Sequence, residues 1–467
     1  MIRRVLVANR GEIAQRIISC CVEMGVECVA AYSEADADQM YVPFATHSIC
    51  IGPARARESY LDVDRVIDAA LTTGCDAVHP GYGYLAESAE LARACEERGL
   101  RFVGPSSQTI AQMGDRCAAR SLAREVGVPV APGSEGVVAT LEEASSVAEE
   151  VGYPVLIKAA AGRDGRGMRR ADGPEELADA FEQASHEGIS YFDRGEVYVE
   201  KLIPASKHIE VQVMADTRGN CVHLGERDCS IQREHVNMIA EAPCARFTPE
   251  LREAMGRAAV DVARACGYVG AGTVEFVLDE ELDFYFIGMK TCIQEEHPIT
   301  ETVYAVDLVR EQLRVASGLA LSFAQEDLRP HGHAIECRIN AETPQKEFRP
   351  SSGTVTMVHL PSGNGTRVDS ALYDGYEVSS FYDTLVAKVT VWAPTRLEAV
   401  RKMRRCLEET VIEGVDTNLD YELFVMFHGA FLKGGYTTAF TDEHKDEILE
   451  LESRAGELED AEEREAR

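Results

Sequence analysis

The segment Arg4–Ala14, RVLVANRGEIA, constrains the fold of this chain most, because an apolar run leads through a glycine into a helix-forming sequence. That order is typical of a buried parallel strand that turns into a helix. A second strand is predicted at Cys28–Tyr32, and Asp76–Gly83 repeats the strand followed by a glycine turn. The alternation predicts a doubly wound parallel sheet with functional loops at the carboxyl ends of its strands.

The sequence changes character twice after this sheet. Runs typical of strands mix with helices from about Met113 to Leu319, and β-rich segments follow from Gly332. The expected fold class is therefore α/β and α+β, with the parts packed into one body. The expected parts are an N-terminal α/β domain at 1–112, a central domain at 113–330 with a lid subdomain at about 131–203, a β-rich C-terminal domain at 331–441 and an acidic tail at 442–467. The tail pattern indicates a solvated helix or disorder.

Charge and apolar runs limit the classes of partner. The formal net charge of -32 argues against a nucleic-acid or anionic-membrane surface, because both would be repelled. No apolar run approaches the roughly 18 residues of a membrane helix, and the first residues do not resemble a signal peptide. We therefore expect a cytoplasmic protein. The 14 cysteines include no Cys-x-x-Cys pair, so neither a disulfide framework nor a zinc finger is predicted.

Five stretches, spread in order over nearly the whole chain, resemble biotin carboxylases. They are ANRGEIA at 8–14, HPGYG at 79–83, ERDCSIQ at 226–232, QEEHP at 294–298 and ECRINAE at 336–342. The resemblance implies an ATP-grasp fold for the central domain and a biotin carboxylase N-terminal and C-terminal domain on either side. It also implies the family reaction, in which ATP activates bicarbonate as carboxyphosphate and the carbon passes to biotin on a separate carrier.

The resemblance implies partners as well. These are the biotin carboxyl carrier protein and the carboxyltransferase subunits of an acyl-CoA carboxylase, such as the acetyl-CoA carboxylase of fatty acid biosynthesis. Biotin is then a substrate borne by the carrier and is not attached to this chain, because Met289-Lys290 lacks the second methionine of an attachment site. Ser19 and Asn364 replace an arginine and an aromatic residue of the family dimer interface, whereas Glu23 and Arg367 remain. A homodimer, or a heterodimer with an active homologue, is the expected assembly.

The residues implied to contact ATP are mostly cationic or amide side chains near strand ends, as a polyphosphate requires. Lys158 resembles the lysine at the α- and β-phosphates, and Glu200 with Lys201 resembles the pair at the adenine. Outside this resemblance, lone histidines are usually surface or core residues. The full implied set is Arg116, Lys158, Glu200, Lys201, His208, Gln232, His235 and Gln294.

The implied magnesium site is incomplete in this sequence. Glu275 resembles the first of two magnesium carboxylates, but Gly288 stands at the position of the second. A glycine offers no carboxylate, so the metal loses half of its anionic ligands. Lys290 replaces a family asparagine and adds a cation beside the same site. We therefore expect the Mg²⁺ site to be weakened or lost.

The catalytic positions are also partly replaced. Glu296 resembles the general base for bicarbonate, and Arg338 resembles the arginine that supports bicarbonate and biotin. Cys292 stands where the family has the arginine that stabilises the biotin enolate, and Asn237 stands where it has a bicarbonate-binding lysine. A thiol cannot replace a permanently charged, planar fork of donors. Glu295 adds a second carboxylate next to the base, which repels an anion unless it points away.

The glycine-rich lid of the family is shortened as well. The stretch at 159–168, AAAGRDGRGM, keeps two glycines of a run of five, and Arg163 and Asp164 are expected to stiffen it.

Three functions remain open from the sequence. By lineage the chain is a biotin carboxylase subunit of an acyl-CoA carboxylase. The second interpretation is a catalytically inactive paralogue that acts as a structural or regulatory, nucleotide-binding partner of an active carboxylase. The third is an ATP-grasp ligase with a new acceptor. For the chemistry we favour the second, because metal, bicarbonate and enolate stabilisation are replaced together while the scaffold motifs remain.

Overall fold

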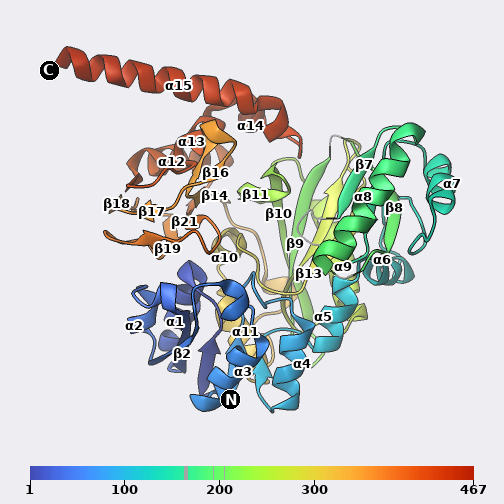
Figure 1. Ribbon diagram of the computed structural model, residues 1–467, viewed down its shortest axis with the longest axis horizontal. Helices are drawn as coiled ribbons and strands as arrows, with labels where there is room; N and C mark the ends of the chain where they lie inside the picture. The colour runs from blue at the N-terminus through green and yellow to red at the C-terminus, as the bar shows by residue number, and fades with distance from the viewer. Residues whose placement is uncertain (162–166, 193, 205, 467) are drawn as a thin grey trace.

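The N-terminal part of the chain is a five-stranded parallel sheet in the order β3-β2-β1-β4-β5. The computed structural model in which it lies describes residues 1–161, 167–192, 194–204 and 206–466 (Figure 1). The central position of β1 agrees with its almost wholly apolar sequence. The strands are β1 Arg4–Val7, β2 Glu27–Ser33, β3 His47–Gly52, β4 Ala77–His79 and β5 Arg101–Phe102.

Both faces of this sheet are covered, because alternate residues of β1 enter two different cores. Val5 and Val7 pack in the core that contains residues of α1 (Gly11–Met24) and α11 (Leu308–Ala316). Leu6 packs in the core that contains residues of α3 and α4. The doubly wound sheet predicted from the sequence is thereby confirmed. The other helices of this part are α2 Tyr41–Phe44, α3 Val63–Thr72, α4 Ala89–Glu97, α5 Ser107–Gly114 and α6 Arg116–Glu125.

A three-stranded antiparallel sheet in the order β7-β6-β8 follows. It packs with two helices around a small separate core that contains Val155, Ile157 and Leu177. Thr140 caps the first helix by accepting from the Glu143 amide, which is typical of a helix start. The elements are α7 Leu141–Val151, β6 Val155–Ala159, β7 Met168–Ala171, α8 Pro174–Phe192 and β8 Val197–Lys201.

An eight-stranded antiparallel sheet forms the centre of the molecule, in the order β13-β12-β9-β10-β11-β14-β21-β19. The pairing of β11 with β14 joins strands from the two sides of residue 331 into one sheet. Helix α9 (Pro249–Ala265) packs on it and begins with the Thr248 cap and a proline in its first turn. The strands are β9 Lys207–Ala215, β10 Cys221–Arg233, β11 Val236–Ala242, β12 Gly270–Leu278, β13 Phe284–Lys290, β14 His333–Asn340, β19 Thr366–Ser370 and β21 Leu385–Ala393.

The C-terminal part adds helices and short strand pairs to one end of this sheet. Its core contains residues of β14, β21 and α12 together with Phe440 and Ile448. The remaining elements are α10 His297–Tyr304, β15 Glu342–Thr343, β16 Arg349–Pro350, β17 Gly353–Thr354, β18 Met357–His359, β20 Glu377–Val378, α12 Arg396–Glu409, β22 Val411–Glu413, α13 Leu419–Phe427, α14 Gly429–Lys433 and α15 Phe440–Ala466.

The acidic tail is the long helix α15, which runs out from the body of the molecule (Figure 1). Of the two predicted states of the tail, the helix is therefore the one observed. None of the 14 cysteines forms a disulfide in the described part of the chain. In the part of the chain that the structure describes, no helix combines the length and apolarity needed to cross a membrane. The fold class expected from the sequence is confirmed.

Candidate active site

Four residues form a row across neighbouring strands of the central sheet. Arg227 on β10 pairs in register with Glu210 on β9, which pairs with Glu275 on β12, which pairs with Gly288 on β13. Residues directly opposite each other in antiparallel strands project to the same face. The sheet therefore presents a cation, two carboxylates and a glycine side by side.

The first pair in the row is a fixed structural unit. The Arg227 guanidinium is fully buried and donates to Glu210 Oε2 at 2.9 Å and to Thr273 Oγ1 at 2.9 Å. Burial opposes ionisation of Glu210, but Arg227 and His208 outweigh it and hold the pKa of that carboxyl well below its ordinary value. Glu210 is therefore an anion that neutralises Arg227.

The predicted metal site lies at the Glu275–Gly288 end of this row. One ligand atom from each of His208, Glu210 and Glu275 lies within 4.8 Å of the others. Glu210 is engaged by Arg227, however, and Gly288 adds no ligand. Burial raises the pKa of Glu275, against the opposing effects of Lys290 and His208. The carboxylate thus lies opposite Gly288, where the family resemblance implies a second acid, and is also influenced by the Lys290 cation, so these residues do not fit a two-carboxylate magnesium site.

The predicted phosphate lysine lies on the three-stranded sheet. Lys158 on β6 is buried and forms an ion pair with Glu200 on β8, whose other oxygen accepts from Arg120 Nη1 at 2.7 Å. Burial opposes ionisation of Glu200, but Lys158 and Arg120 hold its pKa below the ordinary value. Burial also lowers the pKa of Lys158, although Glu200 acts against that shift. One carboxylate thus serves two cations and leaves net positive charge here.

Further cationic groups gather around Lys158. Arg116 begins α6, and its Nη1 atom is buried without a hydrogen-bond partner among the described residues. His235 lies in the two-residue turn between β10 and β11, with a φ of 67°. Burial lowers the pKa of His235, and Lys158, His208 and Arg116 lower it further. Unpaired donors and excess positive charge fit the phosphates of a nucleotide.

The other residues predicted to contact nucleotide form contacts within the chain. The Lys201 ammonium donates to the carbonyls of Gly152 and Tyr153 at 2.9 and 2.8 Å, at the end of α7. Its side chain therefore joins β8 to the segment that follows α7. Gln232 Nε2 donates to Asn237 Oδ1 at 2.8 Å, and Gln294 Nε2 lies 3.7 Å from the Cys292 sulfur.

The two predicted catalytic residues, Arg338 and Glu296, are paired with other side chains of this chain. Arg338 on β14 forms ion pairs with Glu295 and, at 3.4 Å, with Glu296 Oε1. Asn237 Nδ2 donates to the same Glu296 oxygen at 2.7 Å and to Glu210 Oε1 at 3.2 Å. Burial raises the pKa of Glu295 to about 7, with Arg338 opposing and Glu296 adding to the rise. Glu295 thus points toward Arg338 and not away from the site.

The shortened glycine-rich lid cannot be placed in this site. Residues 162–166 of the stretch at 159–168, including Arg163 and Asp164, lie outside the described residues.

Comparisons with known proteins identify relatives over nearly the whole chain. The family described as biotin carboxylase, N-terminal domain, matches residues 1–110, the carbamoyl-phosphate synthase L chain ATP binding domain matches 115–324, and the biotin carboxylase C-terminal domain matches 336–443. Biotin carboxylase 1 of Bacillus subtilis is 49% identical over 95% of this chain and 98% of its own length. The chain belongs to the biotin carboxylase family.

Other members are similar over the whole length. The 2-oxoglutarate carboxylase small subunit of Hydrogenobacter thermophilus is 46% identical over 95% of this chain and 94% of its own. The crystal structure of the biotin carboxylase domain dimer of that organism's 2-oxoglutarate carboxylase, with MgADP, ADP and bicarbonate, has a TM-score of 0.93 at 45% identity and covers 96% of this chain and 99% of that chain. A Campylobacter jejuni biotin carboxylase in complex with β,γ-ATP also has a TM-score of 0.93, at 42% identity, covering 95% and 99% of the two chains.

Within this biotin carboxylase fold, sequence reasoning missed one charged residue that organises the site. Lys388 on β21 is fully buried, lies 3.0 Å from Glu12 Oε1 and donates to the Glu295 carbonyl at 2.9 Å. It joins the N-terminal helix α1 to the loop that carries Glu295 and Glu296. The available signal was a lysine in the middle of the apolar strand Leu385–Ala393, since unpaired lysines are almost never buried.

Proposed function

We propose that this chain is a nucleotide-binding subunit of a biotin-dependent acyl-CoA carboxylase that does not itself carboxylate biotin at a normal enzymatic rate. The family membership supports the assignment to a carboxylase. The proposal on activity rests on the residues in which this chain departs from the family resemblance.

One observation carries the proposal. Arg338, the cation expected to orient bicarbonate, is paired with the carboxylates of Glu295 and Glu296. Asn237 replaces the bicarbonate-binding lysine that the family resemblance implies, and Cys292 replaces the arginine implied to stabilise the biotin enolate. An anion entering this site therefore meets two carboxylates and one arginine that is already neutralised, and repulsion disfavours its binding.

Nucleotide binding is supported by the opposite balance of charge. Lys158 and Arg120 both pair with Glu200, and Arg116 also lowers the pKa of that carboxyl. His235 lies close enough to Lys158 and Arg116 for both to lower its pKa, with Asp442 acting in the opposite direction. We propose that Arg116 and Lys158 bind the phosphates of ATP and that the backbone of Glu200 and Lys201 lines the adenine. His208, Gln232 and Gln294 complete the proposed pocket on the side of the large sheet.

An active biotin carboxylase is the second candidate. Glu296 is buried next to Arg338, and the Arg227–Glu210 pair that supports this region is intact. A base and its neighbouring cation are thus both present. In that case Glu296 accepts a proton from bicarbonate, and Glu295 rotates away from Arg338 when the anion binds.

The test is ATP hydrolysis that depends on bicarbonate and free biotin, measured beside the Bacillus subtilis relative. Loss of one donor to a transition state costs about 10²–10³ in rate, so we expect turnover at least about 10³ below that relative. A variant with Gly288→Glu, Lys290→Asn, Cys292→Arg, Asn237→Lys and Glu295→Val is expected to gain activity. Comparable rates for the unmodified chain and the relative would contradict the proposal, whatever the variant does.

The proposed partners follow from the same family membership. We propose that the chain works with a biotin carboxyl carrier protein and carboxyltransferase subunits, as a homodimer or as a heterodimer with an active homologue. Arg367, one of the retained interface residues, donates to Glu301 Oε2 at 2.6 Å within the chain. Co-purification with an active homologue, compared with size-exclusion chromatography of the isolated chain, distinguishes the two assemblies.

A further inference from the structure

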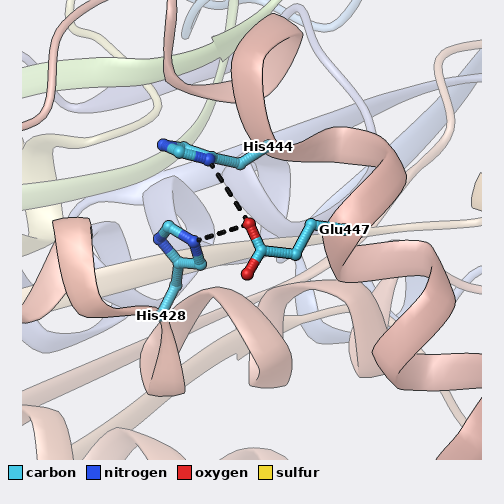
Figure 2. A group of neighbouring side chains, drawn as sticks. All are labelled: His428, His444 and Glu447. Carbon is cyan, nitrogen blue, oxygen red and sulfur yellow. Dashed lines mark ion pairs between the residues drawn. The ribbon is translucent and has the colours of Figure 1, made fainter.

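Two histidines and a glutamate converge where the C-terminal helix leaves the body of the molecule. His428 lies between α13 and α14, and His444 and Glu447 lie one turn apart on α15 (Figure 2). A spacing of three residues places two side chains on the same helix face. The side chains of His428, His444 and Glu447 are 11%, 26% and 61% exposed, so the carboxylate is open to solvent and the imidazoles are partly covered.

The distances within this group are too long for hydrogen bonds. His428 Nε2 and His444 Nδ1 lie 3.5 and 3.7 Å from one oxygen, Glu447 Oε2 (Figure 2). A hydrogen-bonded pair of the same kind in this protein, His333 Nε2 and Glu241 Oε2, is 2.7 Å apart. The two imidazoles therefore face the carboxylate without being hydrogen-bonded to it.

These two distances are close to those between ligands of a small cation. With zinc–ligand bonds of about 2.0–2.2 Å, the edges of a tetrahedron are roughly 3.3–3.6 Å long. All three ligand atoms lie within 4.8 Å of one another. We propose that His428 Nε2, His444 Nδ1 and Glu447 Oε2 bind one Zn²⁺ ion. Two imidazoles favour zinc over magnesium or calcium, which prefer oxygen ligands.

The surroundings leave room for a fourth ligand. A cavity of about 580 Å³ adjoins the group and is lined by His428 and Glu447 as well as by Arg246 and Lys433. A water or a small anion can complete the tetrahedron from this side, and the two cations favour an anion.

Zinc binding changes one hydrogen bond at the start of α14. His428 Nδ1 accepts from the Ala430 amide at 3.3 Å, which places the proton of the neutral ring on Nε2. When Nε2 binds the metal, that proton moves to Nδ1 and the capping bond is lost. A long bond of this kind is weaker than the metal–ligand bonds that replace it.

The consequence is an attachment for the tail. Helix α15 is held to the body near its start by Phe440 and Ile448, and beyond them it extends away (Figure 1). An ion shared by His428 and two residues of α15 fixes the first turns of the helix to the α13–α14 corner. Zinc then adds a second attachment for the start of the tail, beside the apolar contacts of Phe440 and Ile448.

The first test counts bound zinc. The full chain is treated with EDTA, dialysed against Zn²⁺ with a competing chelator and assayed for metal per chain. We expect His444→Ala and Glu447→Gln each to bind one ion fewer than the unmodified chain. The controls are Glu443→Gln, the same charge change at another exposed position of α15, and His359→Ala, an exposed histidine elsewhere. Zinc held by thiols or by His208, Glu210 and Glu275 is common to all variants and cancels.

The second test follows the helix itself. Hydrogen exchange of the amides at 440–456 should slow with Zn²⁺ in the unmodified chain and in both controls, and should not change in His444→Ala or Glu447→Gln. Glu447 is exposed on the helix, so Glu447→Gln is the variant that least disturbs packing. His444 is partly covered and contacts Phe440, so the far-UV circular dichroism of His444→Ala is compared with that of the unmodified chain. Equal stoichiometry in all five proteins, or exchange at 440–456 that ignores zinc, would overturn the proposal.

Discussion

The two ends of the candidate active site treat charge in opposite ways. At the nucleotide end, Lys158 and Arg120 share the single carboxylate of Glu200, and Arg116 keeps a buried donor atom with no partner in the described part of the chain. At the bicarbonate end, Arg338 meets two carboxylates, Glu295 and Glu296. Arg338 Nε, like Arg116 Nη1, has no hydrogen-bond partner among the described residues. The two ends differ in charge: cations outnumber carboxylates at the first, and carboxylates outnumber the arginine at the second.

The difference supports our proposal that the site binds nucleotide and disfavours bicarbonate. A buried donor without a partner costs free energy until a ligand supplies the acceptor, so it is retained where binding recovers that cost. That cost applies to Arg116 Nη1 and to Arg338 Nε alike. The charges differ, because Arg338 is already balanced by two carboxylates while the cations around Glu200 are not.

The largest expected effect is on ATP affinity, and it distinguishes Lys158 from Lys201 on the adjacent strand β8. A hydrogen bond to a charged group contributes about 1.5–3 kcal/mol, so Lys158→Met should weaken ATP binding about 10- to 100-fold. Lys201→Met should change it less than about 2-fold, because that ammonium is bonded to the carbonyls of Gly152 and Tyr153. Titration calorimetry with ATP measures both. Equal losses of ATP affinity would mean that Lys158 contributes no more to binding than Lys201, which would contradict the comparison.

The next effect concerns the metal. A Cβ atom added at Gly288 lies 3.2 Å from Glu275 Oε2, so Gly288→Glu places a second carboxylate beside the first. Two carboxylates this close bind a divalent cation or repel each other. We expect Mg²⁺ to raise the affinity of the variant for ADP about 10-fold and that of the unmodified chain by less than about 3-fold.

The matched control for this change is Gly288→Gln, which adds the same bulk without charge. It should respond to Mg²⁺ as the unmodified chain does. A strong magnesium dependence of the unmodified chain would instead mean that Glu275 binds the ion with Glu210 or His208, despite the Arg227 pair.

The sequence predicted the sheets better than the contacts within the site. Strand β1 and its glycine turn are encoded by neighbouring residues, and the apolar pattern alone places them. The family resemblance predicted that a metal ligand is missing at Gly288. Strand register places Gly288 opposite Glu275, and only the structure gives the distance between them. The capture of Arg338 by Glu295 joins residues 43 positions apart through tertiary packing, and no local pattern encodes it.

Lys388 and the zinc ligands illustrate the same limit. Lys388 looked like one polar residue in a strand, and its partners Glu12 and Glu295 come from distant parts of the chain. His428 lies 16 residues before His444 and outside helix α15, so the spacing does not match a zinc-finger motif. Convergence of separate elements creates both features, and only the folded chain reveals it.

The smallest effect is a pH dependence at the bicarbonate end. The pKa of Glu295 rises from an ordinary 4.5 to about 7 in the folded chain, chiefly through burial. The native state therefore binds more protons than the unfolded state between these two pH values, and stability falls as pH rises through that window. Because the side chain is 26% exposed, solvent screening reduces the loss to about 1 kcal/mol.

Glu295→Gln removes this titration while keeping a hydrogen-bonding side chain near Arg338. The thermal midpoint of the variant, measured by calorimetry from pH 5 to pH 8, should rise relative to that of the unmodified chain by about 1–2 °C across the window. For Glu281→Gln, a substitution at an exposed position, the thermal midpoint should change with pH as it does in the unmodified chain. If the Glu295→Gln difference is flat, or falls with pH, then Arg338 dominates over burial and Glu295 is a permanent anion. The bicarbonate end would then exclude anions at every pH, whereas a neutral Glu295 below pH 7 leaves Arg338 partly unpaired and admits a second anion in mild acid.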